Sequence, residues 1–360
     1  MMRATLCPVS GFLGAGKTTT LLAAARELRR RGHRPAIVTN DQGRDLVDTR
    51  LARTVTDAVA EVLDGCFCCR FDELAGVVTR LVGGGADVVL AEAVGSCTDL
   101  RATVVRPLRE HHGDALRVAP LVTVVDPLRY RAFARSWAAG EDSDTGYLYA
   151  HQLAEADVLA VNKIDLAGQG LGGVLADLGR RNPAARVVPY SARSGEVGAL
   201  VDLLLADAAP DRPDAALDYD RYAAAEAELA WLNHEVAVRG TVRPRAWAGA
   251  ALSALSAWSA AAGALVGHAK VTVTSAEGMA KASLTGAGES PGVDLPGPAS
   301  ASEGHAVFNL RVACSPADLD HACVEAIAAA DRACGTSSES GPGPAAFQPS
   351  YPRPTHRIPA

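Results

Sequence analysis

The sequence lacks the features that direct a protein to membranes or to nucleic acid. No apolar run is long and clean enough to cross a bilayer, and the nearest candidate, residues 247–266, is interrupted by serines. The net charge of −6 gives no general basis for binding nucleic acid, which normally needs a basic face. A predicted strand and a glycine-rich loop start within the first residues, which leaves no room for a signal peptide. We expect a cytoplasmic protein without membrane or nucleic-acid partners.

The composition disfavours wholesale disorder. Hydrophobic residues make up 48% of the 360 positions and charged residues 21%, an ordinary balance for a globular protein. This length allows two domains with well-buried cores, and no internal repeat is visible. In a chain with cytosolic features, the eight cysteines are interpreted as thiols or metal ligands before disulfides.

Strand-like and helix-like segments alternate in the first part of the chain. The predicted strands are short, rich in β-branched residues and almost continuously apolar, which suits strands that are covered on both faces. They span residues 5–10, 34–40, 87–94, 120–126, 157–163 and 186–191. Helical stretches lie between most of them. The pattern predicts an α/β fold with a mostly parallel sheet and with its chemistry at the carboxyl ends of the strands.

A shift in composition to alanine, proline and aspartate near residue 208 predicts a domain boundary. We expect the α/β domain over residues 1–208, a linker over 209–228 and a smaller α+β domain over 229–335. The Pro-rich residues 336–360 are predicted to be disordered. In the second domain, strands are predicted at 231–239, 268–274, 280–285 and 308–313, helices at 245–265 and 316–334, and a loop at 286–304.

The string GFLGAGKT at residues 11–18 matches every fixed position of a phosphate loop, between a predicted strand and a predicted helix. Glycines let successive backbone N–H groups face phosphate oxygens, and the helix N-terminus adds partial positive charge. Lys17 would reach the β- and γ-phosphates, and Thr18 would hold Mg²⁺. An ordinary glycine-rich turn is the alternative, and the matching flanks disfavour it. The predicted nucleotide-binding positions here are Gly11, Gly14, Ala15, Gly16, Lys17, Thr18 and Thr19.

A second motif specifies the base. Asn162, Lys163 and Asp165 form an N-K-x-D string after a predicted strand. The Asp165 carboxylate can accept hydrogen bonds from two donors that guanine presents and adenine lacks, which is a strong form of discrimination. The lysine stem would cover the base. Ser191 and Ala192 follow the next strand and resemble the base-contacting loop of GTPases. The predicted nucleotide is GTP.

Two acidic residues at strand ends are candidates for the catalytic chemistry together with Lys17. Glu92 ends the strand at 87–94 and would hold Mg²⁺ or orient the attacking water, while Gly95 would sense the γ-phosphate. The alternative for Glu92 is a solvated loop glutamate. Asp41, after the second predicted strand, is a candidate for Mg²⁺ or switch duty, with an ordinary turn as the competing interpretation.

A cluster of thiols follows. Cys66, Cys68 and Cys69 offer three soft ligands within four positions, suited to Zn²⁺ or another transition metal. The alternative is buried, inert cysteines. No second pair follows at zinc-finger spacing, so a fourth ligand would come from elsewhere in the chain, from a partner or from water. Cys97 is not included in the predicted set, although its position close after Glu92 would allow it to join. The remaining cysteines, namely Cys7, Cys314, Cys323 and Cys334, are predicted to be packing residues.

On these motifs the chain resembles the CobW/HypB/UreG family of metallochaperone-type P-loop GTPases, closest to its CobW-like branch. The matching strings are GFLGAGKTTT, NDQG, DGCFCC, EAVG, QLAEADVLAVNKIDL and RRNPAARVVPYSA, in family order between residues 3 and 205. The resemblance implies a GTPase domain whose CxCC motif binds a metal ion and hands it to a client. It also implies that Cys66 and Cys68 are the main ligand pair.

The chain departs from the family pattern in three places. NDQG stands for N-E-x-G, which weakens the transfer of a glutamate role to the shorter Asp41. EAVG stands for E-T-S-G, so a hydroxyl is missing beside Glu92. The chain has no histidine-rich segment, which argues against bulk metal storage, and its C-terminal unit matches the family's second domain only loosely.

The sequence leads to the hypothesis of a Mg²⁺-dependent GTPase that delivers a metal ion, such as Zn²⁺, Co²⁺ or Ni²⁺, or a metal-containing cofactor to a client metalloenzyme. No residue is recognisable as an arginine finger, which a partner or the second subunit of a homodimer would supply. A GTPase chaperone that gates cofactor loading without transferring metal is the alternative. A small-molecule kinase is a third hypothesis, and the guanine motif argues against it.

Overall fold

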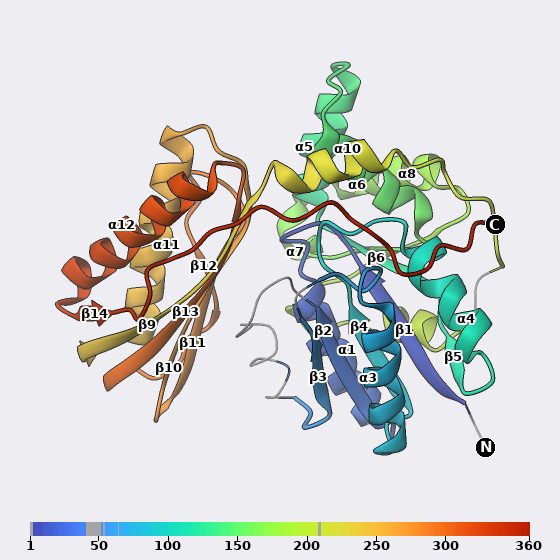
Figure 1. Cartoon of the computed structure of the whole chain (residues 1–360), viewed down its shortest axis with the longest axis horizontal. Helices are drawn as coiled ribbons and strands as arrows, with labels where there is room; N and C mark the ends of the chain where they lie inside the picture. Colours follow the sequence, from blue (N-terminus) through green and yellow to red (C-terminus); the bar gives the residue numbers. More distant parts are fainter. Residues whose placement is uncertain (1–2, 41–51, 53–54, 64, 208–209) are drawn as a thin grey trace. The chain divides into compact units, whose positions relative to one another are not determined.

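The computed structural model describes residues 3–40, 52, 55–63, 65–207 and 210–360. They form two compact units, which are described separately (Figure 1). The first unit contains the described residues up to Ala225 together with Tyr351–Ala360, and the second contains Glu226–Ser350. No helix in these ranges is both long and apolar enough to cross a membrane.

The first unit is built on a parallel sheet with the strand order β3-β2-β4-β1-β6-β7-β8, and β5 pairs with β1. All six strands predicted from the sequence are present, and the α/β expectation is confirmed. Two short strands, β3 and β5, were not predicted. The strands are β1 (Ala4–Ser10), β2 (Pro35–Asn40), β3 (Val59–Val62), β4 (Val88–Glu92), β5 (Leu116–Val118), β6 (Val122–Val125), β7 (Val158–Val161) and β8 (Arg186–Pro189).

Burial explains the continuous apolar runs. Every residue of β1, β2, β4, β6 and β7 is buried, because helices cover the sheet, with α1 and α3 packed against β2 and β4. The strand order reverses around β1, where ligands bind in open α/β sheets. The helices are α1 (Lys17–Arg30), α3 (Phe71–Gly83), the π-helical turn η1 (Arg101–Val105), α4 (Arg106–His112), α5 (Pro127–Ala138), α6 (Asp144–Glu155), α7 (Ile164–Ala167), the 3₁₀ turn η2 (Gly168–Gly170), α8 (Leu171–Arg181), α9 (Gly198–Leu204) and α10 (Tyr219–Ala227).

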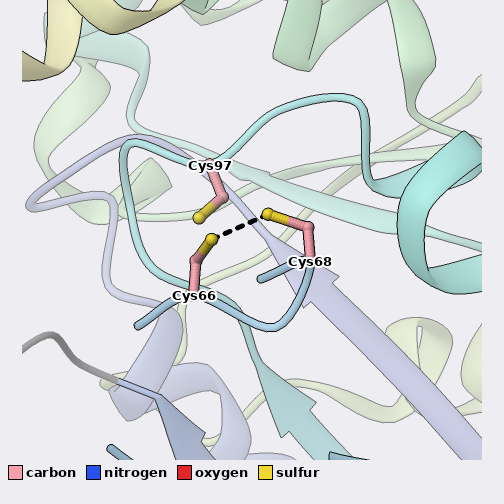
Figure 2. Close-up of side chains that lie close together, drawn as sticks. All are labelled: Cys66, Cys68 and Cys97. Carbon is pink, nitrogen blue, oxygen red and sulfur yellow. Dashed lines mark hydrogen bonds between the residues drawn. The ribbon is translucent and has the colours of Figure 1, made fainter. Parts of the chain in front are cut away.

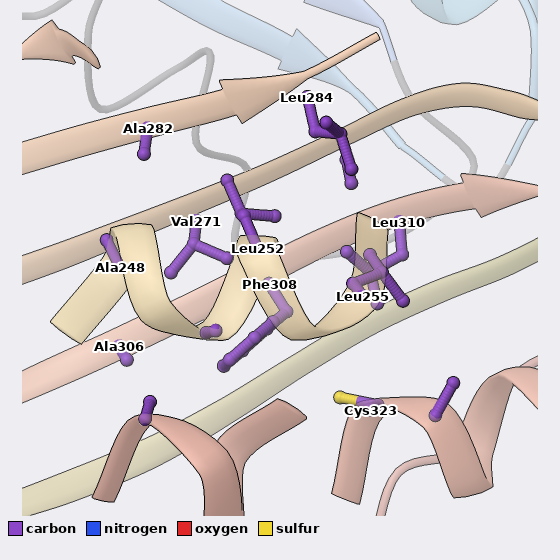
Figure 3. Close-up of a cluster of buried hydrophobic side chains, with 14 of the residues drawn as sticks. Ala248, Leu252, Leu255, Val271, Ala282, Leu284, Ala306, Phe308, Leu310 and Cys323 are labelled. Carbon is purple, nitrogen blue, oxygen red and sulfur yellow. The ribbon is translucent and has the colours of Figure 1, made fainter. Parts of the chain in front are cut away.

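The second unit is an antiparallel sheet with the order β12-β11-β10-β13-β9-β14 and two helices, the α+β arrangement expected. Alternate residues of its strands, including Val271, Phe308 and Leu310, share a buried core with Leu252 and Cys323 of the two helices (Figure 3). The elements are β9 (Ala230–Val242), α11 (Pro244–Ala261), β10 (Val266–Ser275), β11 (Gly278–Leu284), β12 (Gly292–Leu295), β13 (Ala301–Val312), α12 (Pro316–Cys334) and β14 (Ser337–Glu339).

The prediction of a disordered tail over residues 336–360 was wrong. β14 pairs with β9 at the edge of the second sheet, and Tyr351–Ala360 makes hydrogen bonds within the first unit. Backbone pairing with distant segments orders this Pro-rich stretch, although its composition offers little apolar surface to bury. Two other segments also differ from expectation, since α10 lies inside the predicted linker and the predicted loop 286–304 contains β12.

We predict that Phe308→Ala destabilises the second unit by about 3–5 kcal/mol, because it leaves a cavity beside Trp247, whose ring centroid lies 5.8 Å away. Urea unfolding followed by tryptophan fluorescence measures this, since three of the four tryptophans belong to this unit. Val324→Ala on α12 is the control: its side chain is 47% exposed, and we expect a change below about 0.5 kcal/mol. Equal unfolding midpoints for both variants would contradict the assigned core.

Candidate functional site

The phosphate loop joins β1 to α1 with the geometry that its glycines permit. Gly16 has a φ of 92° immediately before α1, and a Cβ there would lie 2.5 Å from the Asn162 side-chain nitrogen. The Lys17 ammonium donates a hydrogen bond of 2.8 Å to the Gly11 carbonyl, so it is held over the loop. Thr19 is exposed on the first turn of α1. The predicted loop, with its helix N-terminus, is therefore present as a possible anion site.

Thr18 and Glu92 lie side by side. The Thr18 hydroxyl donates to the Glu92 carboxylate at 3.1 Å, and both side chains are buried. Sheet register explains this closeness: β1 and β4 run parallel with Val9 opposite Glu92, so the loop after β1 and the acid that ends β4 emerge at the same level. A hydroxyl and a carboxylate are the hard oxygen donors that Mg²⁺ prefers. The structure thus brings together the two residues predicted to share a magnesium ion.

The guanine motif is bound directly to the phosphate loop. Asn162, which follows β7, donates to the Ala15 carbonyl at 3.1 Å and accepts from the Ala192 N–H at 2.9 Å. The Lys163 ammonium lies 2.7 Å from both the Gly14 carbonyl and the Asp126 carboxylate. Asn162 therefore ties together three loops that are far apart in sequence.

The predicted base-reading carboxylate is accessible. Asp165 is exposed, and one of its oxygens accepts a 2.7 Å hydrogen bond from the Ser191 hydroxyl. Lys163 has a φ of 56°, a left-handed conformation that is unusual for lysine and turns the chain between Asn162 and Asp165. The residues predicted to bind guanine therefore form one connected network.

The predicted cysteine set is only partly brought together. The sulfurs of Cys66, Cys68 and Cys97 all lie within 4.8 Å of one another, and all three residues are buried (Figure 2). Cys97 thus takes the place that we had expected for Cys69, whose sulfur lies 3.9 Å from that of Cys68 outside this group. Sequence spacing favoured the adjacent cysteine, but the turn after β4 points Cys97 into the cluster.

Two thiols of the cysteine loop, those of Cys68 and Cys69, have raised pKa values. Hydrogen bonding of Cys68 with Cys66, Cys69 and Cys97, with burial in addition, raises the pKa of the Cys68 thiol well above its usual range. Cys69 is half-buried, and its pKa is also raised, chiefly by its hydrogen bond with Cys66. The Cys68 and Cys69 thiols are accordingly protonated at neutral pH in the metal-free protein, and a cation bound by them would have to displace these protons.

Asn40 positions the cysteine loop and was missed in the sequence. This buried residue ends β2; its amide donates to the carbonyls of Val62 at 3.0 Å and Gly65 at 2.7 Å, and accepts from the Phe67 N–H at 3.0 Å. The NDQG string contained the signal, because Asn40 opens it. Asp41, the residue that we had singled out there, lies outside the described residues.

One short segment links the nucleotide site to the sulfurs. Glu92 ends β4, and Cys97 follows five positions later. Between them, Gly95 packs so closely on the phosphate loop that a Cβ there would lie 3.0 Å from the Leu13 nitrogen. The Gln152 amide, from α6, donates to the carbonyls of both Gly95 and Cys97 at 2.9 Å. Gln152 is a further residue missed in the sequence, although it opens the family-matching string QLAEADVLAVNKIDL.

The chain is similar in sequence to known nucleotide-binding proteins. The nucleotide-binding domain of the CobW/HypB/UreG family matches residues 5–189. The chain is 28% identical over 214 residues to the zinc chaperone CobW of Pseudomonas aeruginosa, and 26% identical over 188 residues to the zinc chaperone YjiA of Escherichia coli. These alignments cover 51% and 50% of this chain and 56% of each relative, so the chain spans little more than half of their length. The crystal structure of Zn(II)-bound YjiA GTPase from E. coli aligns with 92% of this chain and 99% of that one, at 17% identity and a TM-score of 0.39.

We predict that Asn162→Ala lowers the affinity for a fluorescent GTP analogue by about ten- to a hundredfold. It removes two buried hydrogen bonds that join the phosphate loop to the loop at Ala192, each worth roughly 1 kcal/mol, and leaves their backbone partners unsatisfied. Glu196→Ala, an exposed change on the neighbouring loop, is the control and should bind like the parent chain. If both variants bind equally, the assignment of Asn162 fails.

Proposed function

The chain belongs to the CobW/HypB/UreG family, and from this premise we propose that it is a GTPase that binds a transition-metal ion and delivers it to a client protein. Zinc is the favoured cargo, because the two relatives above are zinc chaperones and because clustered thiols are soft ligands. The family is one of P-loop GTPases. For this chain we propose that it hydrolyses GTP, that it has a client protein and that it transfers the metal ion to that client.

The observation that carries the proposal is the segment shared by the two sites. The stretch from Glu92 to Cys97 begins at the proposed Mg²⁺ ligand and ends in the sulfur cluster, while Gly95 packs on the phosphate loop between them. A change in how Glu92 and Gly95 are held would move Cys97 through a few bonds of backbone. Such a link is what a GTP-dependent change in metal affinity requires.

The residues at the nucleotide site suit GTP with Mg²⁺. Lys17 and the helix N-terminus would face phosphate oxygens, and Asp165 would accept hydrogen bonds from the guanine edge. Thr18 and Glu92 would hold the metal ion, which offsets phosphate charge when bound. The part of Asp41 in this chemistry remains a prediction from the sequence.

The sulfur cluster suits a transferable zinc ion. In a tetrahedral site with Zn–S bonds of about 2.3 Å, neighbouring sulfurs are about 3.8 Å apart. The sulfurs of Cys66, Cys68 and Cys97 lie within 4.8 Å of one another, and those of Cys66 and Cys68, which are 2.7 Å apart, would separate to bind the ion. Three protein sulfurs leave the fourth position for Cys69, for water or for a donor from the client. An incomplete protein ligand set favours release over permanent structural binding.

A second candidate function is a GTPase that gates a partner without carrying metal. The burial of Cys66, Cys68 and Cys97, which are 5%, 1% and 0% exposed, favours it, because buried cysteines are often inert packing residues. In that case replacing the cysteines would leave nucleotide-dependent partner binding intact.

The deciding measurement is the zinc affinity of the reduced protein under anaerobic conditions, with and without a non-hydrolysable GTP analogue and Mg²⁺. We expect the affinity to depend on nucleotide and to fall at least a hundredfold in Cys66→Ser/Cys68→Ser, which removes two thiolate donors. The matched control is Cys7→Ser/Cys323→Ser, two buried cysteines outside the cluster. Unchanged binding in the first variant would refute metal delivery, and the gating GTPase would then be favoured.

We predict that Cys97→Ser weakens zinc binding about tenfold or more, whereas Cys69→Ser has a smaller effect. Cys97 belongs to the group of three sulfurs, and Cys69 lies at its margin. Competition with a chromogenic chelator at fixed pH measures both. The reverse order of effects would restore the ligand set expected from the CxCC spacing alone.

A further inference from the structure

The C-terminal segment Tyr351–Ala360 lies on the loop that carries the CxCC motif. The Thr355 N–H donates to the Cys68 carbonyl at 2.8 Å, and its hydroxyl donates to the Cys69 carbonyl at 3.1 Å. The Arg353 N–H points to the Cys69 sulfur at 3.3 Å. The C-terminal segment therefore binds the backbone of two of the three motif cysteines, almost three hundred positions away in sequence.

The same segment also binds the stretch that follows Cys97. The Arg357 guanidinium donates to the Asp99 carboxylate at 2.8 Å, and the Ile358 N–H donates to the Ala102 carbonyl at 2.9 Å. Arg106 returns a hydrogen bond of 3.0 Å to the Ile358 carbonyl. Residues 353–358 thus join the two separate segments that supply the sulfur cluster.

A ring contact adds to this attachment. The His356 ring packs edge-on against Phe71, with centroids 4.9 Å apart, and Phe71 begins α3 directly after the cysteine loop. Pro352 is also buried. The segment has several independent attachments, although Arg353, Thr355 and Arg357 themselves are exposed. A terminal segment that is partly exposed and is not paired in the sheet can detach without unfolding the sheet.

We propose that residues 351–360 form a strap that holds the sulfur cluster closed and limits access to Cys66, Cys68 and Cys97. The inference deepens the proposed function, because a delivered ion must leave a cluster that is buried while the strap is attached. Detachment frees the carbonyls of Cys68 and Cys69 and removes Arg357 from Asp99, which keeps its hydrogen bond with Tyr219, so the two cysteine segments lose the links that residues 353–358 form between them. The strap is therefore a built-in control of metal exchange.

The chain offers a matched pair of variants. Arg357→Ala removes the side chain that binds Asp99, whereas Arg353→Ala removes an exposed arginine of the same segment whose backbone N–H makes the contact with Cys69. Both variants change the net charge equally. Thr355→Pro, which removes the N–H donor to Cys68, and a chain ending at Ser350 test the strap by other routes.

The rate of alkylation of each cysteine in the reduced, metal-free full-length protein, resolved by peptide mass spectrometry, measures access. We expect Arg357→Ala to speed the labelling of Cys66, Cys68 and Cys97 by roughly tenfold, since one charge-assisted hydrogen bond of the closed form is lost. Arg353→Ala should label like the parent chain. Cys7 and Cys323, which are buried elsewhere, serve as internal standards.

The strap is refuted if Arg357→Ala, Thr355→Pro and the shortened chain all label the cluster at the parental rate. It is also refuted if the alkylation rates of Cys7 and Cys323 rise as much as those of the cluster, because this indicates that the whole protein has become less stable. The labelling needs neither metal nor nucleotide, so its outcome is independent of the zinc measurement above. If zinc binds but labelling is not faster in the variants, the proposed function is supported and the strap is refuted. If labelling is faster but zinc does not bind, the strap is supported and metal delivery is refuted.

Discussion

The parallel pairing of β1 with β4 is the constraint on which the rest of the first unit depends. Its register sets Glu92 opposite Val9, so the phosphate loop and the turn after β4 leave the sheet at one level. The hydrogen bond between Thr18 and Glu92 follows from this alignment. Both strands are fully buried and packed on both faces, so a slip of one residue would exchange the side chains of the two faces and disrupt their packing. The hydrophobic core therefore fixes the geometry of the polar site.

Buried polar side chains connect the loops that follow these aligned strand ends. Asn40 holds the cysteine loop, Asn162 holds the phosphate and guanine loops, and Gln152 holds the segment between Glu92 and Cys97. Each amide satisfies backbone groups of loops that would otherwise be free to separate, and such bonds are expensive to break once buried. The two candidate sites consequently share one rigid framework. A small displacement of the backbone at one site is therefore expected to move residues at the other.

Delivery of a metal ion makes opposite demands on the sulfur cluster. Retention of the ion is favoured by burial and by coordination to several thiolates, whereas release of the ion requires that the cluster open. The first unit combines a buried cluster with a partly exposed C-terminal segment attached by hydrogen bonds, the Arg357–Asp99 ion pair and the ring contacts of His356 with Phe71 and His111. Interactions at the surface are individually weak, so their sum can be overcome by competition from another chain. In the proposed function, the buried cluster would retain the ion, and the weakly attached segment would permit its release.

The sequence by itself determined the class of fold and predicted most of the candidate nucleotide site, because both depend on local patterns. Apolar runs predicted six strands, five of which are buried throughout while β8 is partly exposed, and fixed spacings predicted the phosphate loop and the N-K-x-D motif. Short strands such as β3, only partly buried, carried too little pattern to be found. The tertiary structure alone decided that Cys97 replaces Cys69, and that residues 351–360 bind the cysteine loop. Both outcomes join residues distant in sequence, and only the packing of the whole unit determines which distant side chains meet.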